Sequence, residues 1–170
     1  MIEDIIAQSH LLVDTLQFDA GSVALSVLRS ISDSLGNSGP FGRLLDIRFG
    51  DVTPGHCSAT MEVKHHLLNP LGIAHGGATF SFGDTISGCA ALTALGEPRI
   101  VTQDMQIRYH AAVRPGTLHA DANVIHKGQR TVTTQCSIFQ NEILVATLTA
   151  TFAILSDAEL ELVMRGEQKK

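Results

Sequence analysis

Strict alternation of apolar and polar residues in the second half of the chain constrains its fold more than any other feature. The longest run is apolar at every second position: Leu144, Ala146, Leu148, Ala150, Phe152 and Ile154. Three shorter runs precede it: Val101, Met105, Ile107 and Tyr109; Leu118, Ala120, Ala122 and Val124; Val132, Thr134, Cys136 and Ile138. A period of two over segments this long favours β-strands over helix. Turn residues lie at 114–116, 127–130 and 140–142, so we expect neighbouring strands to pair antiparallel.

One helix is predicted ahead of these strands, over residues 78–95, which contain no proline. Core-type side chains recur along one side of it at helical spacing: Phe82, Ile86, Cys89 and Thr93. Gly83 and Gly88 each cost about 1 kcal/mol of helix propensity relative to alanine, so we expect the helix to approach a sheet or a partner chain closely there. Segments 44–49 and 56–66 are expected to be strands. This order indicates an α+β fold, with a sheet on one side of one helix.

Residues 1–40 are predicted to form an N-terminal helical extension, because apolar residues recur in them at helical spacing. A loosely attached arm is the alternative. We assign residues 41–157 to the main domain and residues 158–170 to a C-terminal tail, with a short helix expected over 156–165. The chain shows no internal repeat and no linker, so one main domain is expected.

Composition and charge exclude several classes of function. The formal net charge is -5 and no basic stripe occurs, so nucleic acid is not an expected partner. No run of about 18 apolar residues predicts a membrane span. The acidic start and three widely spaced cysteines indicate a cytoplasmic protein with reduced thiols. No HExxH motif or paired Cys/His spacing occurs, so we expect neither a metal nor a cofactor.

A glycine-rich segment directly before the predicted helix is the strongest candidate for a functional site. Its polar and glycine residues are Asn69, Gly72, His75, Gly76 and Gly77. The N-terminus of a helix presents unpaired N–H groups and a partial positive charge. Glycines at that point let a ligand atom approach the backbone closely. Such N–H groups can stabilise an oxyanion, and one donor is typically worth about 2.7–4 kcal/mol of barrier.

Asp84 lies about two turns into the helix and is the second candidate. It stands between Phe82 and Ile86 on a segment with almost no other charge. Burying a carboxylate in an apolar environment is costly unless it is paired or used in a reaction. Asp84 is therefore either a functional carboxylate or a structural one that caps a backbone group or pairs with an arginine.

The segment from Asn69 to Gly77, followed by Asp84, resembles the signature of the PaaI-type hot-dog-fold acyl-CoA thioesterases. Residues 124–130 resemble a later hairpin of that family, and residues 102–109 resemble its strand after the helix. The resemblance covers about residues 41–155. It implies a long helix wrapped by an antiparallel sheet, two protomers that share one continuous sheet, and active sites at their interface. It also implies a homo-oligomer, commonly a homotetramer.

The resemblance also implies catalytic roles. Gly76 would donate its N–H to the thioester carbonyl. Asp84 of the other protomer would act as the nucleophile or as the general base that activates water. Asn69 would help to place the water or the carbonyl group, and Thr102 stands where the family often has a Ser or Thr that holds the water. His75 would order the loop rather than act as a base.

The implied substrate is an acyl-CoA thioester, with Gly77 among the residues that bind it. Its phosphates need cations, for which Lys127, Arg130 and Arg114 are the candidates. The alternative is that these three are ordinary solvated turn charges. A non-catalytic acyl-CoA-binding or sensing protein on the same scaffold is the alternative function.

Overall fold

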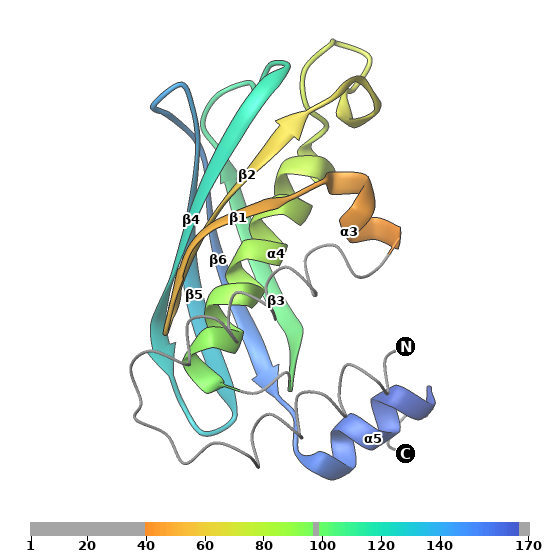
Figure 1. Cartoon of the computed structure of the whole chain (residues 1–170), viewed down its shortest axis with the longest axis vertical. Coiled ribbons are helices and arrows are strands. Elements are labelled where there is room, and N and C mark those ends of the chain that lie inside the picture. Colours follow the sequence, from red (N-terminus) through yellow and green to blue (C-terminus); the bar gives the residue numbers. More distant parts are fainter. Residues whose placement is uncertain (1–39, 97–98, 167–170) are drawn as a thin grey trace.

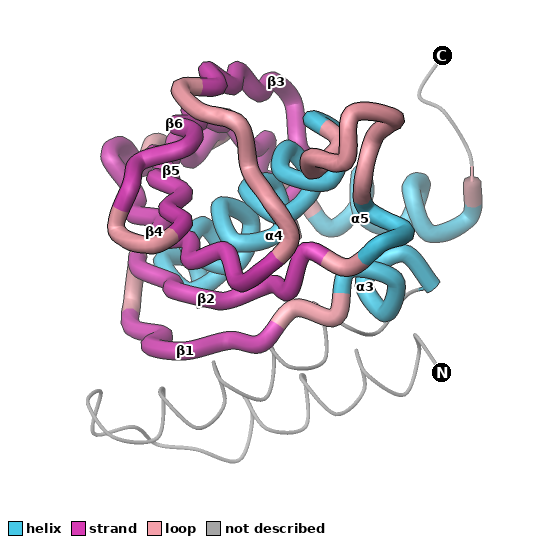
Figure 2. The backbone as a smooth tube through the Cα atoms, turned by 90° about the horizontal axis from the view of Figure 1, so that it is seen from above, coloured by secondary structure: helices cyan, strands magenta, loops and turns pink. Residues whose placement is uncertain are grey.

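Six strands form one antiparallel sheet in the computed structural model, which describes residues 40–96 and 99–166. The strands are β1 (Arg48–Thr53), β2 (His56–Val63), β3 (Ile100–Tyr109), β4 (Gly116–Lys127), β5 (Thr131–Gln140) and β6 (Ile143–Ile154). Their order across the sheet is β1-β2-β4-β5-β6-β3, so β1 and β3 are its edges. The sheet curves around one long helix, α4 (Gly76–Leu95), as Figure 1 and Figure 2 show. The predicted α+β fold, with a sheet wrapped around a central helix, is confirmed.

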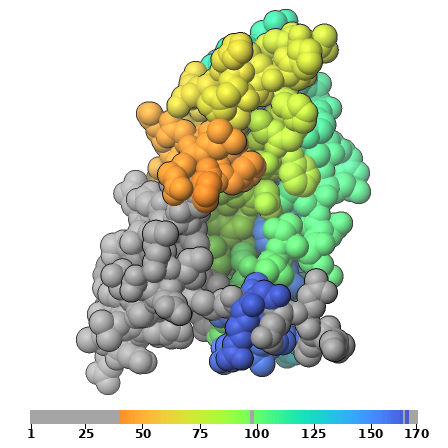
Figure 3. Space-filling model, turned by 90° about the vertical axis from the view of Figure 1, so that its right-hand side faces the viewer, coloured from red at the N-terminus to blue at the C-terminus, as the bar shows by residue number. Residues whose placement is uncertain are grey.

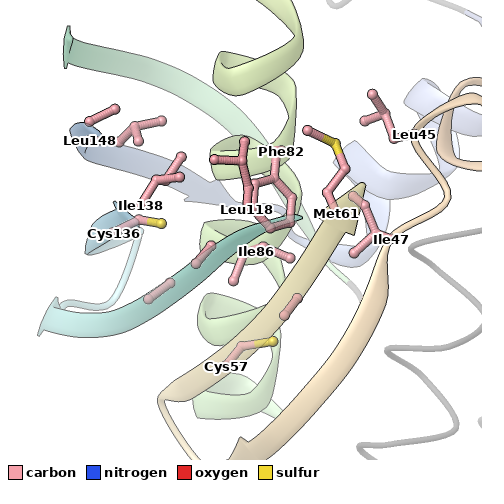
Figure 4. Packing of buried hydrophobic residues seen from close by; sticks show 14 of the residues in the cluster. Leu45, Ile47, Cys57, Met61, Phe82, Ile86, Leu118, Cys136, Ile138 and Leu148 are labelled. Carbon is pink, nitrogen blue, oxygen red and sulfur yellow. The ribbon is translucent and has the colours of Figure 1, made fainter. Parts of the chain in front are cut away.

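The hydrophobic core lies between α4 and the face of the sheet that curves around it. Phe82 and Ile86 of α4 are fully buried, and Cys89 and Thr93 are nearly so. Figure 4 shows Phe82 and Ile86 among side chains that come from the strands: Met61, Leu118, Cys136, Ile138 and Leu148. Burying one large apolar side chain stabilises a fold by roughly 1.5–3 kcal/mol. The alternating apolar residues of the strands therefore hold α4 in place.

Gly83 marks the closest approach of α4 to the sheet. A Cβ built on Gly83 would lie 2.4 Å from Cδ2 of Leu148, which is closer than real carbon atoms pack. A Cβ on Gly88 would lie 3.6 Å from the nearest atom of Phe152, an ordinary contact distance. The expected close approach is thus confirmed at Gly83, whereas Gly88 has room for a methyl group.

Two boundaries near the start of the domain differ from the prediction. The strand expected over residues 44–49 is wrong in its first part, because Pro40–Leu45 form the short helix α3 and β1 starts only at Arg48. Proline is well tolerated in the first turn of a helix, where its missing N–H costs nothing. The second predicted strand ends at Val63 and is followed by the 3₁₀ turn η1, His65–Leu67.

A β-bulge interrupts β3 at Gln103, where the pairing with β6 shifts between Thr102 and Asp104. An extra residue reverses the alternation of side chains between the two faces of a sheet. Thr102 therefore lies on the same face as Met105, toward α4. Val101 lies on the opposite face, with 39% of its surface exposed. The prediction that Val101 shares a face with Met105 is wrong for this reason.

The expected C-terminal helix is present as α5, Asp157–Arg165. Ser156 and Glu159 form a capping box, in which the Ser156 side chain accepts from the Glu159 N–H and the Glu159 carboxylate accepts from the Ser156 N–H. Ion pairs join Arg99 to Asp157 and Arg130 to Glu159. These contacts tie α5 to the ends of the strands.

Figure 3 shows α5 (blue) at one end of the molecule and the segment between β2 and α4 (yellow to yellow-green) at the other. The helix begins at the boundary that we predicted between domain and tail. That boundary stays a prediction. The N-terminal helical extension lies outside the described residues except for Pro40.

Candidate active site

The turn before α4 is fixed by backbone and side-chain hydrogen bonds. Ala74 N donates to the carbonyl of Val113 and His75 N to that of Leu67, both at 2.8 Å. His75 is the N-cap residue of α4, and its Nδ1 accepts a hydrogen bond of 2.9 Å from Gly77 N. The N–H of Gly77 is therefore occupied. For Gly76, the first residue of the helix, no protein acceptor of the N–H occurs among residues 40–96 and 99–166.

Asn69 organises the loop that leads to this turn. Its Oδ1 accepts hydrogen bonds from Leu71 N at 2.9 Å and from Ile73 N at 3.4 Å. Gly72 has a φ of 72°, in the left-handed region that favours glycine, and donates its N–H to the Asn69 carbonyl. Asn69 thus holds the loop with its amide oxygen, which leaves the amide nitrogen as the group available to a ligand.

Asp84 and Thr102 are brought together, although they are 18 residues apart in the chain. Thr102 Oγ1 donates to Asp84 Oδ1 at 3.1 Å. Burial raises the pKa of Asp84, and the Thr102 hydrogen bond opposes that effect. The bulge at Gln103 is what turns Thr102 toward the helix. A half-buried carboxylate with a raised pKa is a typical proton acceptor in enzyme active sites.

Tyr109 contacts the start of α4, and the sequence analysis did not assign it to the site. Its hydroxyl donates to the carbonyl oxygen of Gly76 at 2.8 Å. Tyr109 is the last residue of β3 and lies on the same face as Thr102. Its place in the alternation with Met105 and Ile107 already indicated a side chain directed toward the helix.

The three basic residues expected to bind phosphates lie apart from one another. Lys127 Nζ donates to the carbonyl of Ala94 at 2.7 Å, near the C-terminal end of α4. Arg130 pairs with Glu159 at 3.4 Å. Arg114 instead follows Val113, whose carbonyl binds the turn before Gly76. Of the three, only Arg114 lies at the end of the helix that carries the glycine pair.

The described residues contain no group of three or more His, Cys, Asp or Glu side chains arranged to hold a metal ion. Within the same part of the chain, no helix is both long enough and apolar enough to cross a bilayer. Cys57, Cys89 and Cys136 are buried and form no disulfide among the described residues. Burial raises the pKa of Cys136 to about 12, so this thiol stays protonated and unreactive.

Comparison with known proteins identifies relatives of this chain. A 1,4-dihydroxy-2-naphthoyl-CoA hydrolase of Escherichia coli is 29% identical over 99 residues, which cover 58% of this chain and 73% of that protein. A Pasteurella multocida protein named as an esterase is 30% identical over 95 residues, which cover 55% of this chain and 68% of its relative.

A solved structure and a family profile agree with these relatives. A mutant of the phenylacetic acid degradation protein PaaI from Thermus thermophilus superposes with a TM-score of 0.65 at 26% identity, covering 69% of this chain and 100% of that one. The profile of the thioesterase superfamily matches residues 71–147, from the loop before the glycine pair into β6. The predicted hot-dog fold and family are thus confirmed, and the chain belongs to the thioesterase superfamily.

Proposed function

We propose that this protein hydrolyses acyl-CoA thioesters to a free acid and coenzyme A, with Asp84 as the catalytic carboxylate. The observation that carries the proposal is the half-buried Asp84 of α4, which accepts a hydrogen bond from Thr102 of β3. The first residue of the same helix, Gly76, presents its N–H. The family and its CoA-thioester hydrolase relative support the same chemistry.

In the net reaction the carbon–sulfur bond of the thioester breaks and water supplies the second oxygen of the free acid. The N–H of Gly76 stabilises the oxyanion that forms on the carbonyl oxygen. Asp84 acts in one of two ways. As a general base it removes a proton from the attacking water, and that proton passes to the departing thiolate. As a nucleophile it attacks the thioester carbonyl carbon, the carbon–sulfur bond breaks, and an anhydride forms as the CoA thiolate leaves. Water then hydrolyses the anhydride, which restores the carboxylate and supplies the proton that the thiolate takes up.

Helix geometry supports a site that is shared between two protomers. Gly76 and Asp84 are eight residues apart on α4, a rise of about 12 Å along the helix axis. One thioester carbonyl cannot contact both groups of the same chain at that separation. Asp84 of a second protomer would complete the site. The edge strand β3 pairs with β6 alone in the described chain, so it leaves one side of its backbone for such a partner. We propose a dimer of this kind, assembled into a homotetramer.

The remaining roles follow the local contacts. The Asn69 amide nitrogen and the Thr102 hydroxyl place the water or the carbonyl, and His75 holds Gly77 so that the turn keeps its shape. Arg114 is the first choice for the CoA phosphates, because Lys127 and Arg130 would have to leave protein partners to bind them. We place the reaction in the cytoplasm, where the three cysteines would stay reduced.

The test is release of coenzyme A from a panel of acyl-CoAs, followed with a thiol reagent. We expect Asp84→Asn to lower kcat by about 10²–10⁴-fold. Asp51→Asn is the matched control, because it changes an exposed carboxylate on β1. Equal activity of Asp84→Asn and the wild type would reject Asp84 as the catalytic carboxylate. Binding of acyl-CoA without turnover by the wild type would instead favour a non-catalytic sensor.

A further inference from the structure

Tyr109 covers the first residue of α4 with its ring as well as its hydroxyl. A Cβ built on Gly76 would lie 3.1 Å from the Tyr109 hydroxyl oxygen and 3.3 Å from Cζ. Such distances are tighter than nine in ten real contacts of a Cβ atom. A side chain at position 76 would therefore push the tyrosine hydroxyl away by a few tenths of an ångström. Glycine at this position allows the ring to close over the backbone of the turn.

The peptide unit between Gly76 and Gly77 is held from both sides. Its carbonyl oxygen, on Gly76, accepts from the Tyr109 hydroxyl at 2.8 Å. Its N–H, on Gly77, donates to His75 Nδ1 at 2.9 Å. Glycine has the greatest backbone freedom of any residue, so two successive glycines do not fix this plane by themselves. The two side chains hold this plane from outside the helix. The Gly76 N–H belongs to the preceding peptide unit, whose His75 carbonyl accepts from Ala78 N at 2.9 Å. The two units meet at the Cα of Gly76, so contacts on both of them set the backbone angles that aim this N–H.

We propose that Tyr109 is a positioning residue for thioester hydrolysis, which aims the Gly76 N–H at the substrate carbonyl by holding the Gly76 carbonyl on its other side. The proposal rests on the function proposed above. It is independent of Asp84, since Tyr109 touches the N–H end of the site. Burial also raises the pKa of the Tyr109 phenol, which keeps the hydroxyl protonated as a donor.

The fold supports this role because one strand carries both contacts. Thr102 and Tyr109 both project from β3 toward α4, one to Asp84 and the other to Gly76. They share a face only because the bulge at Gln103 reverses the alternation between them. A single strand, β3, therefore positions both Asp84 and the start of α4.

The first variant to measure is Tyr109→Phe, which keeps the ring over Gly76 and removes only the hydroxyl. We expect kcat to fall about 10–100-fold, since small misplacements of a catalytic donor cost up to about that much. We expect KM and the thermal midpoint to stay near the wild-type values, because the lost contact acts in the transition state. Thr147→Val is the matched control, since it removes a comparable surface hydrogen bond, 3.0 Å from Thr147 Oγ1 to His110 Nε2.

A second variant tests the coupling between the two residues. Gly76→Ala should displace the Tyr109 hydroxyl, so Tyr109→Phe should add little further loss in the double variant. Tyr109 is the only tyrosine of the chain, which contains no tryptophan, so tyrosine fluorescence reports this residue alone. We expect Gly76→Ala to change that fluorescence.

Three results would overturn the proposal. The first is wild-type kcat in Tyr109→Phe, the second an equal loss in Thr147→Val, and the third full additivity in the double variant. The wild type and Asp84→Asn are measured alongside. Turnover that depends on Asp84 but not on Tyr109 rejects only the positioning role. Absence of turnover in the wild type rejects the proposed function, and with it a role of Tyr109 in that reaction.

Discussion

Thr102 Oγ1 donates a hydrogen bond of 3.1 Å to Asp84 Oδ1, so one hydroxyl from the sheet edge meets the carboxylate of the central helix. Two influences on the pKa of Asp84 oppose each other at this contact. Burial raises the pKa and is the larger, whereas the Thr102 hydrogen bond lowers it. The outcome is a carboxyl group whose pKa is above its ordinary value but whose ionised form still has a donor.

Activity should therefore depend on pH through Asp84. Both proposed roles need the ionised carboxylate, so kcat/KM should fall as the pH drops through a pKa above the ordinary value of about 3.9. Thr102→Val removes the hydrogen bond that lowers this pKa and should move the acidic limb to higher pH. Thr102→Ser keeps a hydroxyl and should restore the wild-type profile. Profiles of kcat/KM against pH that coincide for all three proteins would contradict the assignment.

Asp84→Asn should raise stability near neutral pH. A carboxyl group whose folded-state pKa is raised binds more protons in the folded than in the unfolded state. Its stabilisation is complete below the unfolded pKa and is lost as the pH rises through the folded pKa. Asparagine carries no such penalty, so the gain should appear at pH 7 and vanish below about pH 4. Thermal unfolding at both pH values measures it, and a lower midpoint for Asp84→Asn at pH 7 would oppose it.

Alanine at the two glycines inside α4 should have opposite effects. At Gly83 a methyl group would collide with Leu148, so Gly83→Ala should lower the free energy of unfolding by about 1–3 kcal/mol. At Gly88 a methyl group has room, so Gly88→Ala should raise it by up to about 1 kcal/mol, the propensity difference between the two residues. Urea unfolding of the pair gives the comparison. Equal effects at both sites would show that close packing does not decide the outcome.

Mixing two low-activity variants should restore activity if the site is shared between protomers. In a mixed dimer of Asp84→Asn and Gly76→Ala chains, one site has both substituted residues and the other has neither. Co-expression with two different affinity tags isolates this dimer. We expect it to reach about half of the wild-type kcat, as one intact site of two gives. A site contained within one chain would give the mixed dimer only the mean of its two parents' activities.

Substitutions of the basic residues at the two ends of α4 should differ in whether they change KM or the free energy of unfolding. Lys127→Met removes the ammonium group from the Ala94 carbonyl, and should lower the free energy of unfolding by roughly 0.3–1 kcal/mol with little change in KM. Arg114→Met should raise KM about 10-fold, equivalent to about 1.4 kcal/mol of binding. Initial rates at two salt concentrations, together with urea unfolding, distinguish the two. A larger KM effect for Lys127→Met would move the phosphate site to the other end of the helix.

The sequence predicted most of the sheet, because alternation follows directly from which side chains face α4. It also predicted Thr102 as a site residue, but only through the family resemblance. Strict alternation from Met105 would have turned Thr102 away from the helix. The bulge at Gln103 cannot be read from a period of two, since one extra residue leaves the composition of the strand unchanged.

Other differences have equally local causes. Leu44 and Leu45 were predicted as the start of a strand, but they lie in the helix α3, which begins at Pro40. Proline is favoured at the first position of a helix. Tyr109 was recognised as a strand residue and not as part of the site. Its contact with Gly76 joins residues that are 33 apart in the chain, and the local sequence pattern of neither segment predicts it.

Side chains from the sheet bind the backbone of α4 at both of its ends. The Tyr109 hydroxyl holds the carbonyl of Gly76, and the Lys127 ammonium group holds that of Ala94. The helix therefore cannot shift along its axis or rotate about it without breaking one of these two hydrogen bonds. The sheet therefore fixes where Gly76 and Asp84 lie along the helix axis. In a dimer of the proposed kind, the distance from Gly76 of one protomer to Asp84 of the other would then be the same in every copy.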